Sequence, residues 1–220
     1  INSWLQRDIK SLKSQLVIGE SATEGTVFSS YQFTGVRLYS DETMLPNSQR
    51  GFAPTIRGIA NSSAIVTVRQ NGYILYQSNV PAGAFEINDL YPSAFSGDLD
   101  VTIEEADGSI RHFVQPFSAL PQMQRPGYLK YSVTAGRFRA ASSQDSHEPE
   151  FLESTASYGL NNAFTLYGGL NASQDYRALA LGLGSTLGVL GAVSMDVSRA
   201  DTQLDNDESY HGYSWRTQYI

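Results

Sequence analysis

Apolar and polar side chains alternate regularly through residues 128–220, in segments that end at polar turns. A period of two residues indicates β-strands with one apolar face. Each segment has about 9–11 residues, the length that a tilted strand needs to cross a bilayer. The apolar positions of two segments are Leu179, Leu181 and Leu183, and Val193, Met195 and Val197.

The positions between these apolar residues are small or polar and carry few charges, which is typical of a barrel wall that faces a wet lumen. Short turns such as Leu160-Asn161-Asn162 alternate with longer polar loops such as Ser142–Glu150 and Asp201–Ser209. Transmembrane barrels show this alternation of short turns and longer loops. Soluble β-sandwiches also have alternating strands, so the pattern by itself leaves both architectures open.

Residues 51–120 have a different pattern, with shorter β-type runs and tight turns. Asn71-Gly72 and Asp107-Gly108 each separate two runs, and both dipeptides suit two-residue hairpins. We predict a small antiparallel, immunoglobulin-like β-sandwich, inserted between strands of a larger structure. The predicted runs are Thr55–Ile59, Ala64–Arg69, Tyr73–Val80, Leu99–Glu105 and Ile110–Phe117.

The first section, residues 1–50, contains a short apolar run at Leu16-Val17-Ile18 and a longer predicted strand from Val27 to Tyr39. We therefore expect an all-β chain with three parts: barrel strands in 1–50, a sandwich in 51–120 and barrel strands in 121–220. We interpret the chain as an internal fragment of a longer protein.

Composition narrows the classes of function. The net charge of −7 disfavours nucleic-acid binding, because phosphate-binding surfaces concentrate lysine and arginine. The chain has no cysteine and no apolar run long enough for a membrane helix. His112, His147 and His211 lie in separate segments, and Glu104 and Glu105 point to opposite faces of one predicted strand. We expect no catalytic, cofactor or metal site.

Several motifs together resemble the fimbrial outer-membrane usher family, in particular ushers of the type 1 fimbrial kind. The resemblance covers nearly the whole chain. It departs at Pro81-Ala82-Gly83-Ala84-Phe85, where the family commonly has two further prolines. The motifs are Trp4–Asp8, Leu45–Pro54, Val66–Gly72, Phe85–Leu90, Gly97–Ile103, Glu105–Gly108 and Tyr131–Gly136.

The resemblance implies a wide pore in the bacterial outer membrane that secretes and assembles pilus subunits delivered by periplasmic chaperones. Residues 51–120 correspond to the plug that gates this pore, placed in the lumen or the periplasm. Expected partners are chaperone–subunit complexes, outer-membrane lipid and a second usher in a dimer. No enzyme activity and no cofactor are implied.

The plug must move for a subunit to pass, so its two connections are candidate hinges. Proline restricts φ and glycine relaxes it, which gives stiff arms with a few pivots. Ordinary connections have the same composition, so this reading stays open. The candidate hinge residues are Pro46, Arg50, Gly51, Pro116, Pro121 and Gly127.

Residues 54–120 carry seven acidic and three basic side chains. One hypothesis is that this charge meets basic groups on the barrel wall and keeps the gate shut; the other is an ordinary solvated surface. Exposed pairs contribute only about 0–1 kcal/mol each, so several could be displaced together. The candidate gating contacts are Asp98, Asp100, Glu104 and Arg69.

Two rival functions remain open from sequence. A gated outer-membrane transporter of small solutes predicts a ligand-sized site and no affinity for chaperone–subunit complexes. A structural or adhesive β-sandwich protein predicts a chain that needs no detergent, whereas barrel strands with open edges associate in water.

Overall fold

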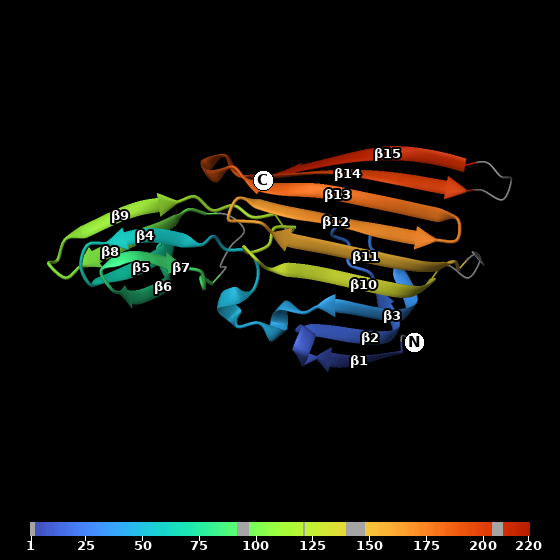
Figure 1. The fold of residues 1–220 in the computed structure, drawn as a ribbon, viewed down its shortest axis with the longest axis horizontal. Coiled ribbons are helices and arrows are strands. Elements are labelled where there is room, and N and C mark those ends of the chain that lie inside the picture. Colours follow the sequence, from blue (N-terminus) through green and yellow to red (C-terminus); the bar gives the residue numbers. More distant parts are fainter. Residues whose placement is uncertain (1–2, 92–96, 121, 140–147, 204–208) are drawn as a thin grey trace.

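The computed structural model describes residues 3–91, 97–120, 122–139, 148–203 and 209–220. Within these residues the larger body is a nine-stranded antiparallel sheet in the order β1-β2-β3-β10-β11-β12-β13-β14-β15 (Figure 1). Its strands are β1 (Trp4–Ile9), β2 (Ser14–Ala22), β3 (Gln32–Ser40), β10 (Leu129–Phe138), β11 (Glu150–Gly159), β12 (Phe164–Ser173), β13 (Tyr176–Thr186), β14 (Ala192–Gln203) and β15 (Ser209–Tyr219).

One face of this sheet is apolar and exposed, and the other, the inner face, is small or polar. The register places Leu181 opposite Val197, and Val197 opposite Trp215, so apolar side chains of three strands share the exposed face. Leu181 is 58% exposed and Trp215 is 75% exposed. Leucines exposed to this extent suit lipid rather than water. The predicted alternation and the barrel-wall strands are confirmed.

Short turns join strands at one end of the sheet. They are η1 (Lys10–Leu12) between β1 and β2, residues 160–163 between β11 and β12, and a turn with η4 (Gly188–Leu190) between β13 and β14. At the other end, residues 23–31 form a longer connection between β2 and β3, but only residues 174 and 175 join β12 to β13, so the predicted alternation of short and longer connections holds only in part.

The smaller body, the inserted sandwich, pairs a two-stranded sheet with a four-stranded one in the order β6-β5-β8-β9. Val66, Val68 and Val101 are fully buried between the sheets. Asn71 and Gly72 have φ of 50° and 83°, as the predicted hairpin turn requires. Its strands are β4 (Ile56–Ala60), β5 (Ala64–Gln70), β6 (Tyr73–Val80), β7 (Gly83–Ile87), β8 (Leu99–Glu105) and β9 (Ile110–Gln115).

The sandwich is inserted between two strands that pair directly. β3 and β10 are hydrogen-bonded neighbours, with Tyr39 opposite Ser132. The first linker, residues 41–55, contains η2 (Glu42–Met44) and η3 (Asn47–Gln49), and the second linker is residues 116–128. The sandwich lies beyond the end of the barrel strands, at the end with the short turns (Figure 1).

Two sequence expectations are corrected. Residues from Val27 onward do not form one long strand: β3 begins at Gln32, and residues 23–31 form a connection that we call the inward loop. β7, at Gly83–Ile87, was not predicted, because glycine and alanine give it a weak apolar pattern. No helix among the described residues is long and apolar enough to cross a membrane.

Candidate functional site

The first linker is held in shape by its own polar side chains. Asp41 accepts hydrogen bonds from the Thr43 N–H at 2.9 Å and hydroxyl at 2.7 Å, and from the Gln15 amide at 2.6 Å. Burial acts to raise the pKa of Asp41, but these hydrogen bonds outweigh it and lower that pKa. Arg50 donates to the Leu45 carbonyl at 2.9 Å. The linker is therefore an ordered arm.

Arg125, in the second linker, joins both linkers to the inserted sandwich. Arg125 is a buried residue, and burial lowers the pKa of its guanidinium. Among the described residues no carboxylate pairs with it; it donates to carbonyl oxygens of two separate stretches, one in the first linker and one in the sandwich. These are Gly51 at 2.8 Å, Arg50 at 3.2 Å, Leu90 at 2.6 Å and Asn88 at 3.4 Å. The planar fork thus fixes these two stretches relative to each other and to the second linker, which carries Arg125.

A second connection comes from the β11–β12 turn of the barrel. The Asn162 side chain accepts from the Thr55 N–H at 3.0 Å and donates to the Thr55 carbonyl at 2.8 Å. On the inner face, the Thr165 hydroxyl accepts from the Gln124 N–H at 3.0 Å. Both linkers are therefore tied to the same barrel hairpin.

Apolar contacts continue the sandwich core through the linkers to the barrel. The rings of Phe52 and Phe117, one from each linker, stack with centroids 6.0 Å apart. They belong to one buried cluster with Leu120, Met123 and Ala192, and Ala192 begins β14. The junction thus combines a dry core with buried hydrogen bonds, so it holds the sandwich in a defined position.

Three candidate hinge residues lie in this junction. Arg50 and Gly51 supply carbonyls to Arg125, and Gly51 has a φ of 61°. Gly127 has a φ of 77°, and its N–H donates to the Gly159 carbonyl at 2.8 Å. Both glycines therefore occupy backbone conformations that other residues rarely adopt.

The three proline candidates are placed less centrally. Pro46 precedes η3 and accepts the Gln49 N–H at 2.8 Å. Pro116 lies beside Gly188 of the β13–β14 turn. Pro121 lies outside the described residues. The hinge role of all six residues stays a prediction.

The candidate gating contacts gather on the four-stranded sheet of the sandwich. Asp100 and Glu104 are exposed on its outer face, Arg69 is directly opposite Asp100, and Asp98 is exposed just before β8. Among the described residues, every ion pair joins two sandwich residues or two barrel residues. The proposed ion pairs between sandwich and barrel are not formed in this arrangement, and their gating role stays a prediction.

Glu105, beside Glu104, has a structural part in the sandwich. Its carboxylate is nearly buried and accepts from the Asn61 N–H at 3.0 Å, from the Ser62 N–H at 2.8 Å and from Arg111 at 2.6 Å. These hydrogen bonds, led by the one from Asn61, lower its pKa to about 2. The two adjacent glutamates do point to opposite faces, as expected.

The inward loop folds onto the inner face of the barrel sheet. Val27 is buried against Tyr167 and Ala180, and Phe28 packs on the same cluster. Gly169 on β12 leaves room for the ring of Phe28, since a Cβ there would come within 2.8 Å of it. Loops usually extend into solvent, whereas this loop packs on the sheet. It therefore occupies part of the space along the inner face.

Ion pairs also fix the inward loop. Arg216 pairs with Asp196 at 2.9 Å and donates to the Val27 carbonyl at 3.2 Å. Glu24, at the start of the loop, pairs with Lys130 at 2.6 Å. The loop is thus bound to β10, β12, β13 and β15, across most of the sheet.

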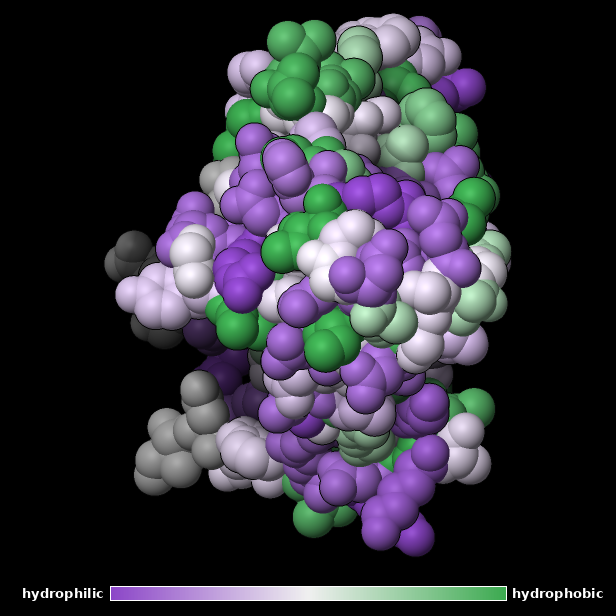
Figure 2. Space-filling view, turned by 90° about the vertical axis from the view of Figure 1, so that its left-hand side faces the viewer, coloured by the Kyte–Doolittle hydropathy of each residue, from purple (hydrophilic) through white to green (hydrophobic). Residues whose placement is uncertain are grey.

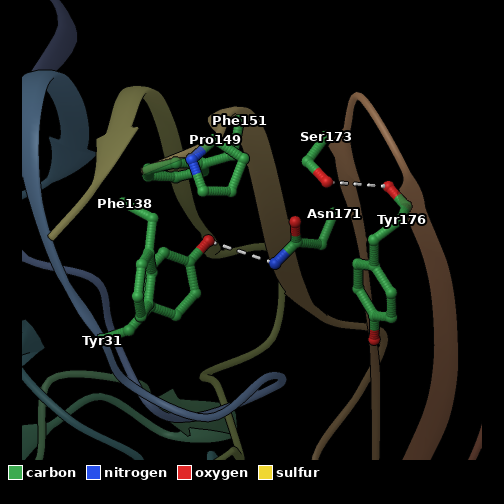
Figure 3. Close-up of a pocket in the computed structure, with 7 residues that line it drawn as sticks. All are labelled: Tyr31, Phe138, Pro149, Phe151, Asn171, Ser173 and Tyr176. Carbon is green, nitrogen blue, oxygen red and sulfur yellow. Dashed lines mark hydrogen bonds between the residues drawn. The ribbon is translucent and has the colours of Figure 1, made fainter. Parts of the chain in front are cut away.

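The end of the inward loop closes a cavity of about 350 Å³ (Figure 3). The Tyr31 hydroxyl donates to Glu153 at 3.0 Å and accepts from the Asn171 amide at 3.1 Å. Aromatic side chains form much of the cavity lining. The lining residues are Tyr31, Phe138, Pro149, Phe151, Asn171, Ser173 and Tyr176.

Sequence reasoning missed Arg125 and Arg216, because an isolated arginine is usually a surface residue. The position of Arg125 between Pro121 and Pro126 could have indicated its role, since a stiff linker can hold one long side chain in a defined direction. His112 lies on the outer face of the sandwich sheet, His211 on β15, and His147 outside the described residues.

Comparisons with known proteins agree on one family. Residues 1–220 match the family described as Outer membrane usher protein. The usher YraJ of Escherichia coli K12 is 74% identical over 220 residues, which are 100% of this chain and 26% of that protein. FimD of the same strain is 47% identical over 219 residues, 100% of this chain and 25% of its own. The chain spans about a quarter of the length of these relatives.

Solved structures give the same answer. One match is a chain of the E. coli P pilus tip assembly intermediate PapC-PapD-PapK-PapG, with 40% sequence identity and a TM-score of 0.67. The match covers 98% of this chain and 27% of the matched chain. The PapC translocation pore matches 99% of this chain and 44% of its own with 38% identity and a TM-score of 0.58. With its all-β barrel strands, inserted sandwich and whole-chain match, this chain belongs to the outer membrane usher protein family.

Proposed function

We propose that the inserted sandwich is the gating plug of an outer-membrane pore that secretes and assembles pilus subunits delivered by chaperones. The usher PapC occurs in an assembly intermediate with PapD, PapK and PapG, and this chain is 40% identical to the matched chain. Chaperone–subunit complexes are therefore the proposed partners, with outer-membrane lipid and a second usher. The proposed work is conformational, with no catalytic step and no cofactor.

The observation that carries this proposal is that the sandwich leaves and re-enters the barrel between two paired strands, β3 and β10. Neighbouring strands lie about 4.8 Å apart, so both linkers start from nearly one point on the wall. The sandwich can then move as a unit without breaking a barrel ladder. A domain connected to two distant strands would instead hold those strands at a fixed distance and could not move freely. We infer that residues 51–120 form this moving unit.

The position of the sandwich supports a plug that can leave the lumen. It lies beyond the end that has the short turns, and short turns are typical of the periplasmic side of outer-membrane barrels (Figure 1). We infer that the contacts of Arg125 and Asn162 hold the plug on that side while the inner face is clear of it. A plug inside the lumen would need these contacts to break.

The test is planar-bilayer conductance of the full-length protein, intact and with residues 52–119 replaced by a short flexible linker. Because β3 and β10 are adjacent, such a linker closes the gap without straining the barrel. We expect large steady conductance in the deleted form and low conductance in the intact form. Equal and low conductance in both would refute the plug and favour a structural β-sandwich role.

A further inference from the structure

The β13–β14 turn is apolar and exposed at the end of the barrel where the sandwich lies. Val189 is 81% exposed, Leu190 66% and Leu187 44%. Short turns between barrel strands usually carry polar or turn-forming residues. The β11–β12 turn fits this expectation, because its asparagines bind backbone groups. The apolar side chains of Leu187–Leu190 are therefore unlike those of a turn that faces water, and they suit contact with an apolar phase.

This turn has a defined conformation that presents its side chains outward. Gly188 and Gly191 have φ of 63° and 97°, and the Leu187 N–H donates to the Gly191 carbonyl at 2.7 Å. The Tyr219 hydroxyl, on the exposed apolar face of β15, donates to the Leu190 carbonyl. Tyr219 thus ties the turn to the apolar side of the sheet rather than to the inner face.

The exposed turn continues the apolar face that the barrel presents to lipid. Met195 on β14 is 55% exposed and Leu183 on β13 is 43% exposed, and they lie opposite each other three residues from the strand ends. Figure 2, which views the sandwich end, shows hydrophobic side chains gathered at the top, where Figure 1 places this turn. An apolar surface in line with the lipid-facing band lies at the level of the lipid headgroups.

We propose that the β13–β14 turn is a membrane-interface anchor, with Leu187, Val189 and Leu190 inserted among the headgroups and upper acyl chains of the phospholipid leaflet on the side of the sandwich. Ala192, directly after the turn, is fully buried in the cluster that contains Phe52 and Phe117. The anchor therefore sets the level of the sandwich junction relative to the membrane surface. This inference rests on the outer-membrane location and not on gating.

The experiment places an environment-sensitive fluorophore on Val189→Cys and, separately, on Leu190→Cys of the full-length protein in phospholipid vesicles. Lipids with a nitroxide near the headgroup or deep in the acyl chain serve as quenchers. Leu181→Cys, in the middle of the lipid-facing band, and Ile110→Cys, exposed on the sandwich, are matched controls. The parental protein, labelled in parallel, gives the background, and heat-modifiable mobility confirms folding.

We expect the shallow quencher to act more strongly than the deep one at positions 189 and 190, and the reverse at 181. Quenching at 189 and 190 no stronger than at 110 would overturn the anchor. A blue-shifted emission without lipid quenching would also overturn it, because the turn would then be covered by protein. Neither result would depend on whether the sandwich gates the pore.

Discussion

The side chain of Asn162 pairs with both backbone polar groups of Thr55, at 3.0 Å and 2.8 Å, as a neighbouring strand would. This contact joins a barrel turn to the first linker just before β4. Together with Arg125 it makes the junction specific, because a misplaced sandwich would leave buried polar groups without partners.

Replacing Asn162→Ala should weaken this junction locally. A net hydrogen bond contributes about 1 kcal/mol, so we expect the Thr55 amide to exchange with deuterium roughly fivefold faster. Hydrogen-exchange mass spectrometry of the first linker measures this. Asn79→Ala, exposed on β6, is the control. Unchanged exchange at Thr55 would show that the pair does not hold the linker.

Replacing Arg125→Lys should loosen both linkers although the charge is kept. A lysine cannot direct a planar fork to carbonyls of two stretches at once, and each buried acceptor left unsatisfied costs about 1–3 kcal/mol. We expect faster limited proteolysis in the two linkers, and a larger effect for Arg125→Ala.

The control for this change is Arg57→Lys, which alters an exposed pair with Glu86. Exposed pairs contribute about 0–1 kcal/mol, so proteolysis should stay near the parental rate. If both lysine variants behave alike, Arg125 does not organise the junction.

Glu105 should make the sandwich sensitive to acid. Hydrogen bonds from the Asn61 and Ser62 amides and from Arg111 lower its pKa from 4.5 to about 2. Its contribution to stability is therefore fully present above about 4.5 and is lost as the pH falls from there through about 2. Glu105→Gln should flatten this dependence, measured as deuterium uptake of β5 and β8 at matched pH.

Glu104→Gln is the matched control for Glu105, since Glu104 is exposed on the opposite face of β8. It should keep the parental acid transition. An acid transition that stays the same in Glu105→Gln would assign the effect to other carboxylates.

Charge reversal at Asp98 and Asp100 tests the proposed gating contacts. If these acids hold a closed plug against basic wall residues, Asp98→Lys with Asp100→Lys should raise the fraction of time that the intact pore conducts. Single-channel recording measures it, and the control Glu86→Lys reverses one acidic charge on the other sheet of the sandwich. If the variant pore conducts for the same fraction of time as the parental pore, Asp98 and Asp100 are part of an ordinary solvated surface.

The sequence by itself determined the features that depend on neighbouring residues. Alternation set which of Leu181 and Ala180 faces lipid, because side chains of a strand point to opposite faces. Asn71-Gly72 determined a hairpin, because both residues accept positive φ. These are local steric rules, so a short stretch of chain suffices to apply them.

Only the tertiary structure decided where non-local partners meet. The sequence predicts a strand that begins at Val27, yet Arg216 and Tyr167, far along the chain, bind Val27 to the inner face as part of a loop. Arg125, in the second linker, becomes a junction because carbonyls of the first linker and of the sandwich converge on it. Such convergence depends on how β3 and β10 pair, and a local pattern contains no information about that pairing.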